Sequence, residues 1–271
     1  MSSRLKSAIK DLFAHLGIGI TRSDHLRRLI DESHFAGDHA RLLADIDFIL
    51  ALPENHASRL LRSLPNSQSQ LRQDLFVLST LCFKQNGFFV EFGAADGVVS
   101  SNTYLLEKDH GWTGILAEPA RAWHARLQEN RSSIIETDCV WRNSESTLSF
   151  NEAQTAEHST IDSFSSSDMH GQRRRGGTTY SVKTISLNDL LRKHGAPRTI
   201  DYLSIDTEGS EYEILSNVDF SFYRFRVITC EHNFTPAREQ ILSLLTGNGY
   251  SRIFTAFSQY DDWYVDAGLS A

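Results

Sequence analysis

Acidic residues follow apolar, β-prone runs at several points of this 271-residue sequence. The sharpest case is IDYLSIDTEGSEYEIL, residues 200–215, in which Asp206 and Glu208 come directly after an apolar run. A carboxylate buried at the end of a strand is costly unless a cation or a hydrogen-bonding group meets it. We therefore expect these acids to face a cationic ligand, a metal ion or a proton that has to be removed, with Asp206 as the main catalytic candidate.

A second run, VITCEHNF, brings Glu231 and His232 to the end of a neighbouring strand. Histidine is the natural base near neutral pH. His232 and Asp206 are therefore both candidates for a catalytic base, with Glu208 and Glu231 positioning it. Helix capping is the alternative for some of the acids, because the S-E-Y-E that begins at Ser210 has the spacing of a capping box.

The loop FFVEFGAADGVVS has the pattern E-x-G-x-A-x-G at Glu91, Gly93, Ala95 and Gly97. Glycine lets the backbone pass close to a ligand, and Ala95 stands where a dinucleotide-binding loop needs a glycine. The pattern favours a nucleoside ligand without a pyrophosphate. We expect Glu91 to order the loop through water or a loop amide, and amides near Asn102, where the next helix opens, to bind a carboxylate. A turn that holds no ligand is the alternative.

Two further strand ends complete the candidate nucleoside site. GILAEP ends in Glu118 and Pro119, and an acid about 20 or more residues after a glycine loop is where a carboxylate binds a ribose diol. IIETDCVW ends its strand at Asp138. Its carboxylate can accept a hydrogen bond from an adenine amino group, while the following backbone amide, that of Cys139, meets the ring. A solvent-exposed strand-end acid is the alternative for Asp138.

These strand ends need a scaffold that brings them to one edge. Short apolar runs alternate with helical stretches, which is typical of βαβ units in a doubly wound parallel sheet, and ligands bind such sheets beyond the carboxyl ends of the strands. The last part, YSRIFTAFSQYDDWYV, has the pattern of two strands joined by a polar turn. We predict an α/β, Rossmann-like, doubly wound seven-stranded sheet, mostly parallel with a C-terminal antiparallel hairpin. The expected strands before that hairpin are 88–92, 115–117, 134–135, 202–205 and 227–230, and the expected helices are 69–85, 101–110, 119–130, 210–217 and 236–247.

Two segments fall outside this alternation. Residues 1–65 carry apolar residues at three- and four-residue steps, which predicts an N-terminal helical extension for docking or for a homodimer, in front of a ligand-binding domain at 66–271. Residues 151–181 are polar and almost without periodicity, as in a functional or disordered loop. We interpret their Arg173–Arg175 run as a solvated turn. An active-site lid that grips a phosphate or an acidic glycan is the alternative.

Composition argues against several classes of function. A net charge of −7 argues against general nucleic-acid binding, which needs a basic face. No apolar run approaches the roughly 20 residues of a membrane span, so we expect no stable membrane insertion. Cys82, Cys139 and Cys230 have neither disulfide-framework nor zinc-site spacing. We expect three small buried cysteines in a reducing compartment, the cytoplasm.

Several motifs in a fixed order resemble the FkbM family of S-adenosylmethionine-dependent methyltransferases. The combination of SNT-x-x-LE, GW-x-GI-x-x-EP and D-x-EG-x-E is specific, and the resemblance spans roughly residues 66–271. One departure is Arg72, which stands where a glycine is common. The matching segments are SQLRQDLFVL (69–78), GFFVEFGAADGVVSSNTYLLEKDHGWTGILAEP (87–119), SLNDLL (186–191), the run at 200–215 and CEHN (230–233).

The resemblance implies methyl transfer from S-adenosylmethionine to oxygen, usually a hydroxyl of a sugar, glycolipid, polyketide or other specialised metabolite. The acceptor would then be a small molecule or a glycan. By position, the resemblance makes Glu91, Gly93 and Gly97 the cofactor loop, Glu118 the ribose contact and Asp138 the adenine contact, and it puts Asp206 near the transferred methyl group.

Two versions of this chemistry stay open. In one, His232 or Asp206 removes the proton of the acceptor hydroxyl; in the other, Mg²⁺ on Asp206 and Glu231 lowers the pKa of the acceptor. Two other functions also stay open. The missing middle glycine argues against an NAD(P)-dependent Rossmann oxidoreductase, and the acids at four strand ends argue against a non-catalytic S-adenosylmethionine-binding scaffold protein.

Overall fold

The computed structural model describes residues 40–166 and 171–268, which divide between two compact units, Met1–Leu52 and Pro53–Ala271. In the first unit, residues 40–51 are helical. The helical pattern expected before residue 40 lies outside the described residues. The second unit opens with η1 (Glu54–His56), α3 (Ala57–Ser63) and η2 (Leu64–Asn66), so the expected boundary after residue 65 falls inside this unit.

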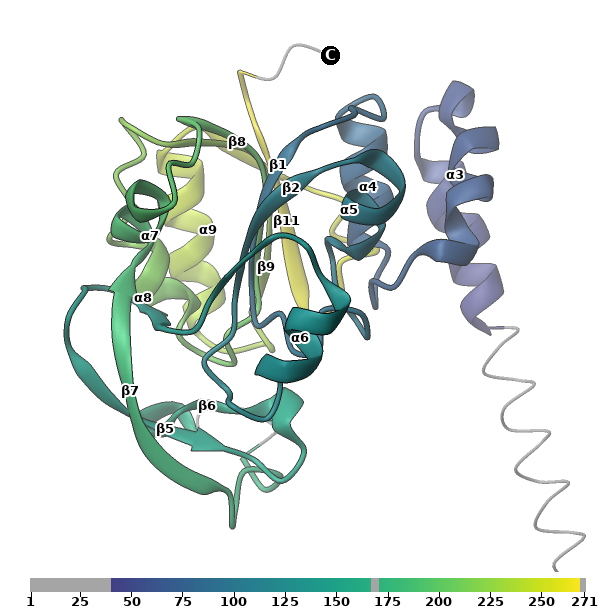
Figure 1. The fold of residues 1–271 in the computed structure, drawn as a ribbon. Helices are drawn as coiled ribbons and strands as arrows, with labels where there is room; N and C mark the ends of the chain where they lie inside the picture. The colour runs from purple at the N-terminus through teal and green to yellow at the C-terminus, as the bar shows by residue number, and fades with distance from the viewer. Residues whose placement is uncertain (1–39, 167–170, 269–271) are drawn as a thin grey trace, which may run out of the picture. The chain divides into compact units, whose positions relative to one another are not determined.

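The second unit contains the predicted seven-stranded sheet (Figure 1). The strand order is β10-β11-β9-β8-β1-β2-β3, and β11 alone runs against its neighbours. The α/β, Rossmann-like fold class is confirmed, including the C-terminal antiparallel hairpin. The strands are β1 (Phe88–Phe92), β2 (Thr113–Ala117), β3 (Ile134–Glu136), β8 (Thr199–Ile205), β9 (Arg224–Glu231), β10 (Tyr250–Ile253) and β11 (Asp261–Asp266).

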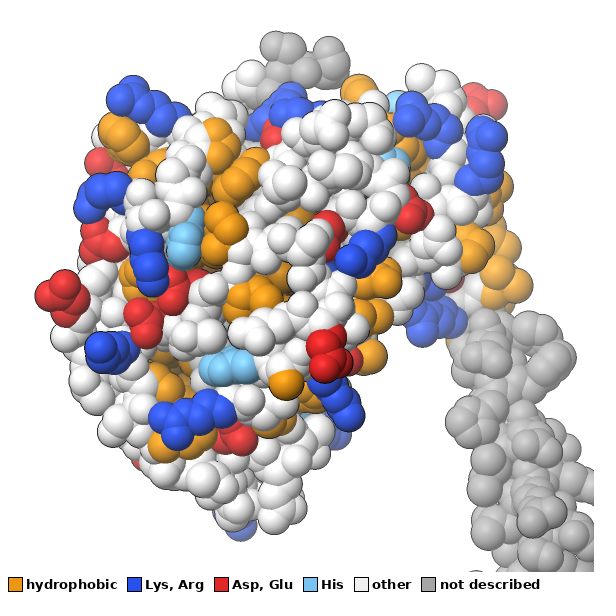
Figure 2. All heavy atoms as spheres, viewed as in Figure 1, with side chains coloured by type: hydrophobic (Ala, Val, Ile, Leu, Met, Phe, Trp, Pro, Cys, Tyr) orange, Lys and Arg blue, Asp and Glu red, His pale blue; other side chains and the backbone are white. Residues whose placement is uncertain are grey.

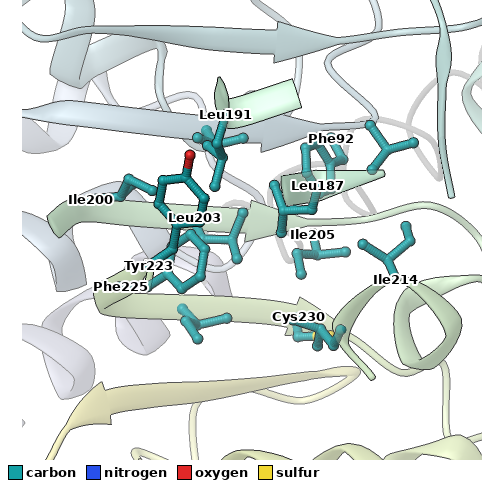
Figure 3. Close-up of a cluster of buried hydrophobic side chains, with 14 of the residues drawn as sticks. Phe92, Leu187, Leu191, Ile200, Leu203, Ile205, Ile214, Tyr223, Phe225 and Cys230 are labelled. Carbon is teal, nitrogen blue, oxygen red and sulfur yellow. The ribbon is translucent and has the colours of Figure 1, made fainter. Parts of the chain in front are cut away.

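Helices cover both faces of this sheet, which is why its central strands consist largely of continuous apolar runs. In Figure 1, α7, α8 and α9 lie on one side and α4, α5 and α6 on the other. Figure 3 shows Leu187 and Leu191 of α7 and Ile214 of α8 in one buried cluster with Leu203 and Ile205 of β8. The helices are α4 (Gln73–Thr80), α5 (Tyr104–His110), α6 (His124–Asn130), α7 (Leu187–Lys193), α8 (Glu211–Leu215) and α9 (Ala237–Gly247).

Several helix starts differ from the sequence prediction: α4 begins at Gln73 and not at residue 69, and α5 at Tyr104 and not at residue 101. Helix α6 begins at His124 and not at Pro119, because residues 121–123 form a turn first. The predicted capping box at Ser210 is wrong, since this side chain caps no amide of α8. The Glu211 carboxylate instead accepts hydrogen bonds from the amides of Thr207 and Gly209, both at 3.0 Å.

A second, four-stranded sheet, not predicted from the sequence, takes in both ends of the long loop expected at 151–181 and two residues in its middle. Its order is β4-β7-β5-β6, with β7 paired to β5 in antiparallel register. Phe150, Ile161 and Val182 are buried in its own small core, together with Trp141. Serine and threonine on the alternate positions hid the period of two that these strands have. The strands are β4 (Cys139–Trp141), β5 (Thr147–Glu152), β6 (Thr160–Ile161) and β7 (Thr178–Ser186), and 3-10 turns η3 (Ala156–His158) and η4 (Asp162–Phe164) flank β6.

The cysteines agree only in part with the expectation of three buried thiols. Cys139 and Cys230 are buried as expected, but Cys82 is exposed. On the face drawn in Figure 2, Lys and Arg side chains are interspersed with Asp and Glu, without a continuous basic stripe. Over the part of the chain that the structure describes, no helix has the length and apolar character of a membrane span.

Candidate active site

A cavity of ≈ 380 Å³ lies where β1, β2, β8 and β9 end. This volume is within the range of small-molecule sites, about 300–1,000 Å³. Gly93, Glu118 and Asp206 from the main sheet line it, and Phe150 and Ile161 of the second sheet form part of its wall. The second sheet is therefore part of the site, and not only an insertion beside it.

Both glycines of the loop after β1 are required, for different reasons. Gly93 has φ +74°, and a Cβ there would lie 2.0 Å from the backbone oxygen of Asp206. Gly97 has φ +78°, and its Cβ would lie 2.6 Å from atoms of Leu127 and Arg131. Gly93 lines the cavity with Ala95, whereas Gly97 does not. The need for glycine at position 97 is thus explained by packing on α6 and the residue that follows it, and not by approach to a ligand.

Glu91 lies beneath this loop, outside the cavity lining, and orders it. It accepts a hydrogen bond from the amide of Asn102 at 2.7 Å and others from the hydroxyls of Ser101 and Thr103. The Asn102 side chain donates to Ser204 of β8 at 3.0 Å and is also absent from the lining. The Asn102 amide, expected to meet a ligand carboxylate, is thus already bound to Glu91.

Glu118 lines the cavity at the end of β2, with Pro119 and Cys139 beside it in the lining. Its two carboxylate oxygens accept hydrogen bonds from the amides of Ala95 at 2.8 Å and Ala120 at 2.7 Å. Burial nevertheless raises the pKa of Glu118 to about 7. This acid ties the glycine loop to the next strand while facing the cavity.

Asp138 does not line this cavity. It belongs to a separate hollow with Ser144, Asp189 and Lys193. The main sheet's third strand ends two residues earlier, at Glu136, and from Cys139 the chain enters the second sheet. The geometry therefore does not place Asp138 where it could contact an adenine bound in this cavity.

Asp206 and Glu231 form a pair of carboxyl groups in the cavity wall, with oxygens within 4.8 Å of each other. The register of β8 and β9 pairs Ile205 with Cys230, so the next residues of the two strands meet. Burial and the charge of Glu208 raise the pKa of Asp206 to about 8. Burial and the charge of Asp206 raise the pKa of Glu231 well above its usual range. Two carboxyl groups this close share a proton, because both cannot ionise cheaply.

The third acid, Glu208, is neutralised by the segment that the sequence suggested was a solvated turn. Arg174 is fully buried and donates to Glu208 Oε2 at 2.7 Å. His158 Nδ1 lies 3.2 Å from Glu208 Oε1. The solvated-turn interpretation is thus wrong for Arg174, whose neighbour Arg173 lines the cavity.

His232 does not line the cavity. Glu231, the last residue of β9, lines the cavity, whereas His232, the residue after it, does not. Its Nδ1 accepts from the amide of Phe234 at 3.0 Å, and its Nε2 is 3.8 Å from Asp262 Oδ1. Burial lowers the pKa of this imidazole. The geometry therefore does not support His232 as the base.

Several lining residues escaped the sequence prediction. Gln70 donates to Ser100 Oγ at 3.2 Å and accepts from Tyr260 at 2.7 Å, which brings the segment before α4 to the cavity. The SQLRQD motif was the available signal for Gln70. In the same segment Arg72 has φ 66°, a conformation that favours glycine. This backbone conformation is a physical reason for the glycine common at that position.

The raised pKa of Asp206 predicts a pH dependence of stability. Its ordinary pKa is 3.8 and its folded value about 8, so between these values the folded chain holds more protons than the unfolded chain. The contribution of Asp206 to the free energy of unfolding is therefore full below pH 4 and falls as the pH rises towards 8, by at most about 1.4 kcal/mol per pH unit.

Urea unfolding of the wild type and of Asp206→Asn, measured without cofactor at pH 5, 6, 7 and 8, checks this. The variant should lose less stability than the wild type over this range. Equal pH slopes for both proteins would contradict the assignment of a raised pKa to this pair.

The sequence profile of the Methyltransferase FkbM domain matches residues 91–263, more than half of the chain. Among solved structures, the chain is similar to precorrin-6y C5,15-methyltransferase from Geobacter metallireducens GS-15, with 11% identity, 71% of this chain and 85% of that chain covered, and a TM-score of 0.37. It is also similar to a chain of the fibrillarin/Nop5p complex, with 12% identity, coverage of 69% and 78%, and a TM-score of 0.31. No curated protein matches the sequence significantly. With the profile spanning the glycine loop, Glu118, Asp206 and Glu231, the chain belongs to the FkbM methyltransferase family, and its methyl donor is S-adenosylmethionine.

Proposed function

We propose that the protein methylates a hydroxyl oxygen of a sugar, glycolipid, glycan or specialised metabolite. The observation that carries this proposal is the close Asp206–Glu231 carboxyl pair in the cavity wall. An alcohol has to lose its proton as its oxygen attacks, so a hydroxyl acceptor needs a base, and a carboxylate with a pKa near the working pH is suited to that task.

The residues present fit S-adenosylmethionine. Glu118 offers a carboxylate to the ribose hydroxyls, and Phe92, Val140 and Ile161 offer apolar surface to the adenine. The close approach of residue 93 to Asp206 brings the glycine loop next to the proposed base. When bound, this cofactor supplies a methyl group attached to a sulfonium sulfur. Methyl transfer is easy because the sulfur leaves as a neutral thioether.

The protein's own residues then have three tasks. The Asp206 carboxylate accepts the hydroxyl proton while the oxygen forms its bond to the methyl carbon. Glu231, the protonated partner, donates its hydrogen bond to Asp206 and holds it in place; Asn233 fixes Glu231 in turn through a 2.7 Å hydrogen bond. The cavity aligns the acceptor with the methyl group and excludes water, which is where most of the acceleration of such a displacement arises.

This mechanism does not require a metal ion. Asp206, Glu208 and Glu231 present carboxylate oxygens within 4.8 Å of one another, a set that could hold Mg²⁺. However, a shared proton compensates Asp206 and Glu231, and Arg174 compensates Glu208. Turnover should therefore survive EDTA, and its loss on chelation with recovery on added Mg²⁺ would instead favour the metal version.

The proposal is tested by transfer of a labelled methyl group from S-adenosylmethionine to metabolite and glycan extracts. Labelled product should form in a protein-dependent reaction that S-adenosylhomocysteine inhibits, and the label should resist alkali, as an ether does. Tight cofactor binding without transfer to any fraction would favour the scaffold alternative. Label on nitrogen or in an alkali-labile ester would contradict hydroxyl methylation.

Replacing Glu118 with glutamine is expected to weaken S-adenosylhomocysteine binding about tenfold or more, because a charge-assisted hydrogen bond to the ribose is lost. Titration calorimetry measures this change. The matched variant is Asp138→Asn, which alters an acid outside the cavity lining and should bind as the wild type does. A tenfold loss in Asp138→Asn would restore this residue as the adenine contact.

A further inference from the structure

Among the described residues, the cavity lining contains one lysine or arginine side chain, that of Arg173. Four acids line the same cavity, and each has a partner in the protein. Glu118 binds two backbone amides, Asp206 and Glu231 share a proton, and Glu208 pairs with Arg174. Arg173 is exposed, and among the described residues no carboxylate lies within ion-pair distance of it. The cavity thus has one positive charge that the described residues do not compensate.

The guanidinium of Arg173 is held at the cavity by a second residue. Its Nη1 lies 2.6 Å from His158 Nε2. Arginine can only donate, so Nε2 is the acceptor and the imidazole proton sits on Nδ1, which faces Glu208 at 3.2 Å. This contact uses one of the five N–H donors of Arg173. The other donors are available for a ligand in the cavity.

The two neighbouring arginines differ in a way that supports this role. Arg174 donates its hydrogen bonds inside the protein, to the backbone oxygens of His158 and Phe164 and to Glu208. Arg175 is exposed and does not line the cavity. Arg173 alone combines solvent access, a place in the cavity wall and a fixed position. A planar fork of donors of this kind suits carboxylate and phosphate groups.

We infer that Arg173 binds a carboxylate or phosphate group of a ligand in this cavity. The anion belongs either to the methyl acceptor, such as an acidic or phosphorylated sugar, or to the amino-acid end of the cofactor. The second source is relevant because the Asn102 amide, expected to bind that carboxylate, is engaged by Glu91. If the anion belongs to the methyl acceptor, the inference rests on the proposed function; if it belongs to the cofactor, the inference does not depend on it.

Calorimetry on Arg173→Gln, with Arg175→Gln as the matched control and Arg173→Lys as the charge-retaining variant, tests the inference. The first arm titrates S-adenosylhomocysteine and 5′-methylthioadenosine, which lacks the carboxylate. If the cofactor supplies the anion, Arg173→Gln weakens S-adenosylhomocysteine about tenfold and leaves methylthioadenosine unchanged. The second arm saturates the protein with S-adenosylhomocysteine and titrates inorganic phosphate, glucuronate and glucose.

If the acceptor supplies the anion, phosphate or glucuronate binds the wild type and the control about tenfold more tightly than Arg173→Gln, while glucose does not discriminate. Arg173→Lys should keep part of the affinity in either case. Equal binding by Arg173→Gln and Arg175→Gln for every probe would overturn the inference. These readouts need no turnover, so they stay informative if hydroxyl methylation itself fails.

Discussion

Replacing Asp206 with asparagine is expected to lower the rate of methyl transfer by about 10²–10⁴-fold, the usual contribution of a general base. Asparagine keeps the size of the side chain but cannot accept the hydroxyl proton. Since burial already disfavours a charge on Asp206 in the folded protein, the uncharged substitute should not disrupt the fold. S-adenosylhomocysteine affinity should stay within a few-fold of the wild type.

The control for this variant is Glu239→Gln, which removes an exposed acid on α9. It should transfer methyl groups at the wild-type rate. Initial rates with labelled S-adenosylmethionine, measured beside calorimetric affinities, separate loss of chemistry from loss of binding. An Asp206→Asn protein that turns over at more than a tenth of the wild-type rate would remove Asp206 from the mechanism.

Replacing Arg174 with methionine is expected to cost about 3–5 kcal/mol of unfolding free energy, the penalty for leaving one member of a buried ion pair unpaired. The Arg174 side chain has no solvent exposure and that of Glu208 has 9%. The change also removes hydrogen bonds to the backbone oxygens of His158 and Phe164. Because these contacts attach the second sheet to the cavity edge, methyl transfer should fall as well.

A double variant, Arg174→Met with Glu208→Gln, separates the buried charge from the lost packing. It should be more stable than Arg174→Met alone, since no carboxylate is then left unpaired. Arg175→Met, at the exposed neighbouring position, should stay within about 0.5 kcal/mol of the wild type. Urea unfolding gives all three values. Equal stabilities for the single and the double variant would show that the Arg174–Glu208 charge pair is not the cause.

The main sheet and half of the site could be predicted because both depend on local patterns. Parallel strands covered by helices on both faces have apolar runs, and the acids that follow the runs mark one edge of the sheet. Glu118, Asp206 and Glu231 were predicted in this way and Gly93 from the glycine-loop pattern, and all four line the cavity. Their meeting follows from strand order, which alternation of strands and helices strongly constrains.

What escaped prediction depends on contacts between distant residues or on side-chain direction. Arg174 and Glu208 lie 34 positions apart, and nothing near either residue signals the other. The second sheet was missed because serine and threonine blur its period of two. His232 was assigned to the site by its place at a strand end, although its side chain contacts Asp262 and the Phe234 amide outside the cavity lining. Asp138 was misplaced because β3 ends at Glu136.

The most direct test of the account is the identity of the atom that receives the methyl group. With ¹³C-methyl S-adenosylmethionine, carbon–proton correlation spectra of the purified product should show the labelled methyl bonded to an oxygen that replaces a hydroxyl, and Asp206→Asn should give little of this product. A labelled methyl on nitrogen, carbon or sulfur, or an undiminished yield from Asp206→Asn, would contradict it.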